Sequence, residues 1–467
     1  MSNMFDVVVM GAGTAGLPLA IFAADRGAKV CLIERGPEVG GCLLINRGQM
    51  SGAGTQLQKQ RGIDDSPAKH LDDVIRISKG TTDRAFAAMA VDLQGPFIDW
   101  LMENGFEILD DMPRIIHGHE AYDIPRTYWG REDGRSILKV LKPMLDKHVA
   151  AGRVVVKLHT SVRSLIKSES GAVIGVETDT NNERILARSV VLSSGGYGAN
   201  PALHSKIHPG KTLWSGSYHL AHGRGLELGL GVGGVLVHAD KFLPGFGGIL
   251  DHTLAVPRYR SMGGLTPQDR PQWEVVVNAR GQRFYAEDCG SVDQRAHDLA
   301  QQPDGRAWVI FDETIKREAP NLFYYFNREK TDDFYKRNKG VVSAATLQDL
   351  AAACGIDAPG LGKTIADYNV AVGTGKDSLG RTFMPKKIEN GPFYAVAIFS
   401  YTVRSVGGLK VDTGFRVLDQ NGSAIPGLYA VGEILGSMIS GAGAVGGMSL
   451  TPALVFGRLL GEKLLPI

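Results

Sequence analysis

A glycine-rich turn close to the start of the chain limits the possible folds more than any other feature. The turn GAGTAG, residues 11–16, follows the apolar run Phe5–Met10 and opens a helical pattern over residues 14–26. A second strand-like run at residues 29–33 ends at Glu34, about 20 residues after the turn. This order of strand, turn, helix and strand predicts the βαβ unit of a dinucleotide-binding Rossmann fold.

Each residue of this motif has a physical role in holding a dinucleotide. Gly11 permits the turn, Gly13 lets a pyrophosphate approach the backbone, and Gly16 allows the helix to pack closely on the strand. The first turn of the helix offers unpaired N–H groups and a partial positive charge to the phosphates. Glu34 can accept a hydrogen bond from each hydroxyl of a ribose.

Two further GxGxxG strings lack this context. Residues 229–234 follow a helical pattern instead of a strand, and residues 441–446 have no acidic residue about 20 positions later. We interpret both as close-packing glycine loops. The chain is therefore expected to bind one dinucleotide and to have no separate NAD(P)H domain.

The length and texture of the chain indicate two structural units. The 467 residues are more than one simple core needs. Mixed α and β patterns at both ends flank a middle segment rich in aromatic, charged and turn residues. We therefore predict a first domain formed by residues 1–235 and 389–467, interrupted by an inserted domain at residues 236–388.

Charge and cysteine usage exclude several classes of function. The formal net charge is +2 without a basic stripe, which argues against nucleic acid as a partner. The four cysteines are scattered and form no CxxC pair, so neither a metal site nor a redox disulfide is expected. No apolar stretch is long enough to span a bilayer, and no signal-peptide pattern precedes the first strand. We expect a cytoplasmic protein.

Several other segments match a known family in order and spacing. They are GG (40–41), GQMSGAGT (48–55), SSGGYGAN (193–200), HGRGLELG (222–229), NARGQRFYAED (278–288), VGGLKVD (406–412), IPGLYAVGE (425–433) and GAVGGMSLTPALVFG (443–457). With the first turn and Glu34, they resemble the fumarate reductase and succinate dehydrogenase flavoprotein superfamily, which includes the 3-ketosteroid dehydrogenases. The resemblance covers nearly the whole chain.

The resemblance implies an α/β fold: a Rossmann-like FAD-binding domain of the glutathione reductase type with an inserted α+β capping domain. The substrate would lie between the cap and the isoalloxazine ring. A helix starting near residues 448–450 would direct its N–H groups to the flavin N1 and O2 atoms. Motif and resemblance together assign the FAD contacts to Gly11, Gly13, Ala15, Gly16, Glu34, Arg35, Gly41, Cys42, Gly54, Thr55, Val162, Ser194, Gly195, Glu433, Gly447, Ser449 and Leu450.

The same resemblance bears on how FAD is held. Members that bind FAD covalently use a histidine in the segment that matches residues 41–55. This sequence has no histidine there. We therefore predict non-covalent FAD.

Departures from the fumarate reductase pattern determine the predicted chemistry. The active-site arginine of that pattern aligns with Ala444, and its substrate histidine aligns with Val403, beside Arg404. The arginine that follows the RFxNE motif is also missing, because Glu287 is followed by Asp-Cys-Gly. A dicarboxylate reductase that lacks its proton donor has lost its general acid, so fumarate reduction is not expected. The uncharged SGAGAVGG stretch instead resembles the ketosteroid dehydrogenases, although their loop tyrosine is replaced by Ser440 or a glycine.

Five residues are candidates for the catalytic site. Arg404 stands two residues before a GG turn, and its alternative role is a structural salt bridge. Tyr128 and Arg131 lie in an unusually arginine-rich segment, 124–136, which a solvated loop would explain equally well. Tyr401 and Ser440 fall near the predicted pocket. His219 and His222 are weaker candidates, while Tyr324 and Tyr325 of the insert are as well explained by packing.

These observations predict an FAD-dependent dehydrogenase that removes hydrogens from the α and β carbons of a carbonyl substrate. A cyclic ketone or keto acid is expected, with a quinone or an electron-transfer protein as the electron acceptor. One alternative is the reverse reaction, an enone or enoate reductase of the fumarate reductase type fed by an electron-transfer partner. Another is a flavin subunit that only relays electrons, although a relay needs no inserted cap.

Overall fold

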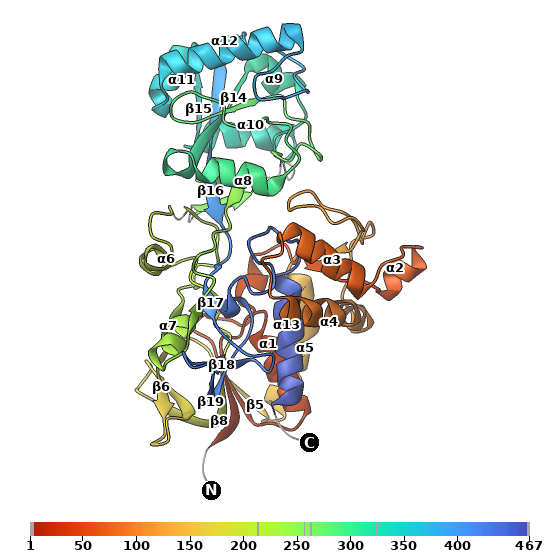
Figure 1. The fold of residues 1–467 in the computed structure, drawn as a ribbon, viewed down its shortest axis with the longest axis vertical. Helices are drawn as coiled ribbons and strands as arrows, with labels where there is room; N and C mark the ends of the chain where they lie inside the picture. The colour runs from red at the N-terminus through yellow and green to blue at the C-terminus, as the bar shows by residue number, and fades with distance from the viewer. Residues whose placement is uncertain (1–3, 213, 256, 262–263, 324–325, 465–467) are drawn as a thin grey trace.

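A computed structural model of the chain describes residues 4–212, 214–255, 257–261, 264–323 and 326–464. Tyr324 and Tyr325 lie outside the described residues. The molecule is elongated, with one lobe that contains both chain ends and a second lobe built from the middle of the chain (Figure 1). Each lobe has its own buried apolar cluster. The chain therefore folds as a first domain and an inserted cap.

The first lobe is built on a sheet whose central strands are parallel. Its strand order is β18-β19-β8-β1-β2-β5, with β18 antiparallel to β19, and the meander of β6 and β7 joined to β8. β1 pairs with β2 on one side and with β8 on the other, so the βαβ unit predicted from the first turn is confirmed. The strands are β1 (Phe5–Met10), β2 (Val30–Ile33), β5 (Val154–Lys157), β6 (Val162–Lys167), β7 (Val173–Thr178), β8 (Arg184–Leu192), β18 (Arg416–Leu418) and β19 (Ala424–Ala430).

Helices cover this sheet, and one of them comes from the far end of the chain. The C-terminal helix α13 packs against α1 and α4, as the blue, red and orange ribbons of Figure 1 show. Close contact requires glycine here: a Cβ at Gly457 would lie 2.2 Å from the Ala15 carbonyl oxygen. The helices of this lobe are α1 (Gly16–Asp25), α2 (Gln56–Gln60), α3 (Pro67–Ile77), α4 (Arg84–Glu103), α5 (Arg135–Ala150), α6 (Pro201–Ile207), α7 (Arg224–Gly231) and α13 (Leu450–Lys463).

In the described residues, the cap is a second, mainly antiparallel sheet covered by five helices. Its strand order is β12-β11-β16-β14-β13, with β15 and β9 also paired to β16. The strands are β9 (Trp214–Ser215), β11 (Gly245–Asp251), β12 (Arg258–Ser261), β13 (Val275–Val277), β14 (Arg306–Asp312), β15 (Val341–Ala344) and β16 (Phe393–Thr402). The helices are α8 (Val292–Ala300), α9 (Glu313–Glu318), α10 (Arg328–Arg337), α11 (Leu347–Cys354) and α12 (Ala358–Thr374).

Strands β9 and β16 belong to the cap sheet, although both fall outside the predicted insert of residues 236–388. The domain boundaries at residues 236 and 389 stay a proposal, and this sheet favours boundaries further out on both sides. Two short ladders complete the structure: β3 (Met50–Ser51) with β4 (Thr127–Tyr128), and β10 (Leu236–Val237) with β17 (Gly408–Leu409). The 3-10 turns are Gly41–Leu44, Pro303–Gly305 and Glu433–Leu435.

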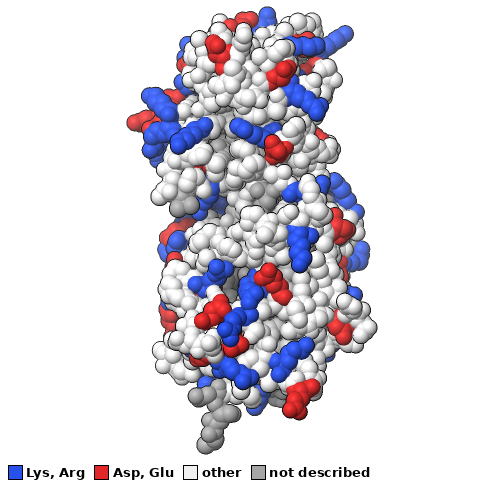
Figure 2. Space-filling model, turned by 90° about the vertical axis from the view of Figure 1, so that its left-hand side faces the viewer, with Lys and Arg blue, Asp and Glu red and all other residues white. Residues whose placement is uncertain are grey.

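Both discounted glycine strings are parts of this packing. Residues 229–231 form the last turn of α7, and residues 441–446 lie in the connection between the last 3-10 turn and α13. On the face shown in Figure 2, basic and acidic side chains are interspersed over both lobes. Within the described ranges, no helix is long and apolar enough to cross a membrane.

Candidate active site

A large cavity lies between the carboxyl ends of the parallel strands and the cap. Its volume is about 1330 Å³. Pockets for a single small ligand are usually about 300–1,000 Å³. The cavity is therefore large enough for a dinucleotide and a second, smaller molecule. Parallel α/β sheets bind ligands at this edge, where the strands end.

At one end of the cavity, the first turn presents bare backbone. Gly11 has φ of +108°, and a Cβ there would lie 2.6 Å from the Ser193 carbonyl oxygen. A Cβ at Gly13 would meet only the Cα of Gly41, at 3.7 Å, so this backbone faces open space. A pyrophosphate can therefore approach Gly13, as the motif requires. Gly16 does not line the cavity: a Cβ there would lie 1.8 Å from the Gly11 carbonyl oxygen, so its role is close packing.

Glu34 is buried beside this turn and is held in place by the backbone. One carboxylate oxygen accepts from the N–H of Ala12 at 2.9 Å, and the other accepts from the N–H of Gly36 at 2.7 Å. Each oxygen keeps further lone pairs for a ribose diol. The buried hydroxyl of Ser194, which also lines the cavity, has no hydrogen-bond partner among the described residues. These groups fit the cofactor that the first turn predicts.

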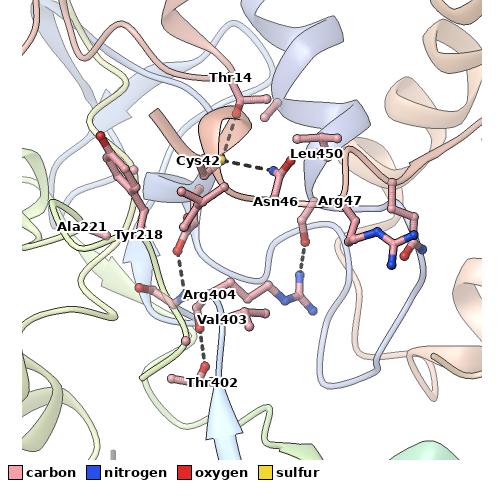
Figure 3. Close-up of a pocket in the computed structure, with 18 of the residues that line it drawn as sticks. Thr14, Cys42, Asn46, Arg47, Tyr218, Ala221, Thr402, Val403, Arg404 and Leu450 are labelled. Atoms are coloured by element: carbon pink, nitrogen blue, oxygen red, sulfur yellow. Dashed lines mark hydrogen bonds between the residues drawn. The ribbon is translucent and has the colours of Figure 1, made fainter. Parts of the chain in front are cut away.

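Cys42 lies opposite the turn and is not a nucleophile. Its Sγ is 3.1 Å from the hydroxyl of Thr14, and it accepts from the amide of Asn46 at 3.6 Å. Burial raises the pKa of the Cys42 thiol to about 11, so the thiol stays protonated near neutral pH. Figure 3 shows these side chains on one side of the cavity, while the Arg404 guanidinium points toward Arg47 and Leu450.

Most of the predicted FAD contacts line this cavity. Gly54 and Thr55 do not line it. The Thr55 hydroxyl instead caps α2 by accepting from the N–H of Gln58. The residues that line it are Gly11, Gly13, Ala15, Glu34, Arg35, Gly41, Cys42, Val162, Ser194, Gly195, Glu433, Gly447, Ser449 and Leu450. Their contacts with FAD stay a prediction.

The C-terminal block forms the middle of the cavity wall. Helix α13 begins at Leu450, and the side chain of Ser449 does not cap its first turn. Unpaired N–H groups at the start of a helix favour an anion there. Glu433 accepts from the N–H of Ser405 at 2.8 Å, and burial raises the pKa of its carboxyl.

Arg404 follows the last strand of the cap and brings a cation into the cavity. It donates to the hydroxyl of Ser440 at 2.8 Å and to that of Ser449 at 2.5 Å. Among the described residues, no carboxylate lies within ion-pair distance of its guanidinium. Burial lowers the pKa of Arg404 to about 10, with Glu433 and Asp293 acting in the opposite direction. The side chain is therefore still protonated at neutral pH. This geometry favours an anion site over the structural salt bridge that was its alternative role.

The other catalytic candidates divide into two groups. Tyr401 and Ser440 line the same cavity as Arg404, and burial raises the pKa of the Tyr401 phenol. Tyr128 and Arg131 do not line it. The Tyr128 hydroxyl is fully buried, 2.6 Å from that of Thr55, and Arg131 pairs with Asp110 on the surface. Neither lines the cavity in this arrangement, and a catalytic role for Tyr128 or Arg131 stays a prediction.

Sequence reasoning missed the histidines of the segment IIHGHEAY, residues 115–122. His117 and His119 both line the cavity. His117 Nδ1 is 3.0 Å from a carboxylate oxygen of Asp269 in the cap. Burial lowers the pKa of His119 to about 4, and the charge of Arg404 acts in the same direction. The signal that the sequence offered was a pair of histidines, separated by one residue, after the apolar residues Ile115 and Ile116.

Comparisons with known proteins agree with this architecture. The family described as FAD binding domain matches residues 6–450. The probable fumarate reductase Ifc3 of Shewanella frigidimarina strain NCIMB 400 is 28% identical over 467 residues, which is 99% of this chain and 75% of that protein. Urocanate reductase of Eggerthella lenta is also 28% identical, over 98% of this chain and 74% of that protein.

Two solved structures have the same fold. The open conformation of a flavocytochrome c3 fumarate reductase superposes with a TM-score of 0.81 at 26% identity, covering 99% of this chain and 78% of that chain. The 3-ketosteroid Δ1-dehydrogenase of Sterolibacterium denitrificans, in complex with 1,4-androstadiene-3,17-dione, gives 0.79 at 19% identity and covers 99% of both chains. At that identity, the second likeness shows the fold alone.

Proposed function

This chain belongs to the FAD-binding-domain family of flavoproteins, and from that premise we propose that it desaturates the bond between the α and β carbons of a carbonyl compound. The chain is an FAD-dependent oxidoreductase of the fumarate reductase family, and its relatives act on C=C or CH–CH groups. The proposed substrate is a cyclic ketone or keto acid. We also propose that FAD is held without a covalent bond, because residues 41–55 contain no histidine and the Cys42 thiol is protonated.

The observation that carries this proposal is the Arg404 guanidinium in the cavity wall. The Arg404 side chain is partly buried, and a charge that is partly removed from water usually has an ionic partner. Among the described residues, two serine hydroxyls and the carbonyl oxygen of Gly443 accept from it, and none of these groups carries a charge. An oxyanion of the substrate would supply the missing negative charge. A guanidinium fork binds such a group in a fixed orientation.

The protein groups then have separable roles in the reaction. Arg404, oriented by Ser440 and Ser449, would bind the carbonyl oxygen and stabilise the negative charge that grows there when the α-proton leaves. An arginine with this pKa does not act as the base at neutral pH. FAD, when bound, supplies the two-electron acceptor for the β-hydrogen. The cap would exclude water from the site, and the electron acceptor that reoxidises the flavin is proposed to be a quinone or an electron-transfer protein.

The names of the relatives favour a second candidate, the reduction of an activated C=C bond. Fumarate and urocanate reductases are among them. The same Arg404 would then bind the carbonyl or carboxylate group of an unsaturated acceptor. An electron-transfer partner would have to supply the electrons.

Anaerobic mixing separates the two directions. The oxidised holoenzyme is mixed with cyclohexanone, 3-oxocyclohexane-1-carboxylate and aliphatic keto acids, and the flavin absorbance is followed. The photoreduced enzyme is mixed with the corresponding enones and enoates. We expect bleaching of the oxidised enzyme by at least one saturated carbonyl compound. Reoxidation by enoates alone would establish the second candidate, and no reaction in either direction would refute both.

A further inference from the structure

In the sequence, the residues before and after His119 both contact the cap. Before it, His117 contacts Asp269 of the cap at 3.0 Å. After it, the carboxylate of Glu120 accepts from the hydroxyl of Ser291 at 2.6 Å and from the N–H of Asp293 at 2.8 Å. Ser291 is the N-cap of α8, so Glu120 binds the start of a cap helix. The segment of His119 is therefore held both by these cap contacts and by the first domain, where Glu120 forms a β-bridge with Val445.

The His119 side chain lines the cavity, and its ring makes no hydrogen bond with the described residues. It lines the cavity together with Arg404, and the charge of Arg404 contributes to its low pKa. A Cβ at Gly446 would lie 3.6 Å from its Cδ2 atom, so the ring packs against the backbone of the C-terminal block. A neutral imidazole in this setting has a free lone pair that can accept a proton.

Four other titratable groups of the cavity are less suited to take a proton. Burial raises the pKa of both the Tyr401 phenol and the Cys42 thiol, so neither is ionised at neutral pH. Glu433 is held by the N–H of Ser405 and is attracted to the charge of Arg404, and Asp269 is paired with His117 at 3.0 Å. Among these groups, His119 alone combines the neutral form with a ring that no described residue hydrogen-bonds, and it lines the same cavity as Arg404.

We propose that His119 takes the α-proton of the carbonyl substrate while Arg404 binds the carbonyl oxygen. This inference rests on the proposed function and adds the base that it lacks. In this step the bond between the α carbon and its hydrogen breaks, and the proton moves to the imidazole. The electron pair moves into the new bond between the α carbon and the carbonyl carbon, and the carbonyl oxygen becomes an enolate oxygen. The step is an enolisation and needs no oxidant.

Exchange of the α-hydrogens for deuterium isolates this step from the redox reaction. The oxidised holoenzyme is incubated anaerobically in D₂O with 3-oxocyclohexane-1-carboxylate, and exchange is followed by proton NMR against a buffer blank. A positioned proton-transfer group contributes roughly 10²–10⁴-fold. We expect His119→Gln to exchange at least about 100-fold more slowly than the wild type. His252→Gln, a histidine of the cap outside the cavity, should exchange like the wild type.

Wild-type exchange in His119→Gln with full FAD content would overturn the assignment. Absence of enzyme-dependent exchange in the wild type would overturn it as well. A wild type that exchanges the α-hydrogens without bleaching its flavin would support His119 and refute the desaturation, so the two failures are distinguishable.

Glu120 provides a second test, as a positioning residue. Glu120→Gln keeps an oxygen that can accept from Ser291 and Asp293, so exchange should stay near the wild-type rate. Glu120→Ala removes both bonds and should slow exchange. Equal rates in the two variants would show that this contact does not position His119.

Discussion

Replacing Arg404 by methionine should impair binding and catalysis while leaving the fold at least as stable. Methionine keeps most of the length of the side chain but removes its charge. The fall in the Arg404 pKa from 12.5 to about 10 corresponds to about 3 kcal/mol by which the protein disfavours the charged form. The pKa of Arg404 is lower in the folded protein than in the unfolded chain, so at neutral pH its charge destabilises the fold. This penalty is lost as the pH rises from about 10 to 12.5.

The hydrogen bonds of Arg404 offset part of this gain. It donates to the hydroxyls of Ser440 and Ser449, and each such bond contributes about 1 kcal/mol. We therefore expect Arg404→Met to change the free energy of unfolding by about 0 to +2 kcal/mol. Catalysis should move in the opposite direction, since a preorganised donor to an oxyanion contributes about 3–4 kcal/mol. The value of kcat/KM should fall by roughly 10²–10³-fold.

The assay combines urea unfolding, FAD content and steady-state kinetics with any carbonyl compound that bleaches the flavin. Arg404→Lys is the matched control, because it keeps a positive charge but loses the fork, and we expect an intermediate kcat/KM. A loss of more than about 2 kcal/mol of stability in Arg404→Met would indicate that Arg404 supports the fold and would refute this reasoning.

Four further outcomes are expected. Gly13→Val should purify without FAD, because its side chain would occupy the space next to Gly41 into which a pyrophosphate fits; absorbance of the purified protein measures this, and Gly62→Val, where a Cβ meets nothing within 4 Å, is the control. Acid precipitation should release FAD into the supernatant, and flavin kept in the pellet would contradict non-covalent binding. The rate of α-hydrogen exchange should fall with a midpoint near pH 4 as His119 becomes protonated, and a midpoint near 6.5 would contradict its depressed pKa. NADH and NADPH should not bleach the flavin rapidly under anaerobic conditions, and saturable bleaching would contradict the absence of a nicotinamide site.

The elements that the sequence predicted well are those with local signals. The first turn, its strand and its helix follow from glycine spacing and an apolar run, and the fold confirms them. The ends of helices also have local signals. Thr346 is the N-cap of α11, and Asp357 caps α12 with Pro359 in its first turn.

The cap sheet could not be predicted because its pairings are distant in the chain. Strand β16 pairs with β9, β11, β14 and β15, which are far from it in sequence. No local pattern reports such contacts, and β14 reads as a continuous apolar run that a buried helix could also have.

In the candidate site, too, some features have a local sequence signal and others depend on contacts that are distant in the chain. Arg404 was identified beside a glycine turn, whereas its bonds to Ser440 and Ser449 depend on how the C-terminal block folds back. The arginine density of residues 124–136 fitted either a substrate site or a solvated loop, and for Arg126 the structure shows a third role. Arg126 is fully buried and forms ion pairs with Asp65 and Asp73, which is a structural role. Composition alone does not tell which side of such a segment faces a cavity.

The central claim is that both hydrogens leave adjacent carbons of a carbonyl compound. Single-turnover reaction of the anaerobic holoenzyme with 3-oxocyclohexane-1-carboxylate deuterated at the ring β carbons tests it most directly, with flavin absorbance and product mass followed together. We predict one enone formed per flavin reduced, slower bleaching with the deuterated compound, and loss of both signals in Arg404→Met. Bleaching without a new C=C bond, or no bleaching with this compound or the other carbonyl compounds, would contradict the account.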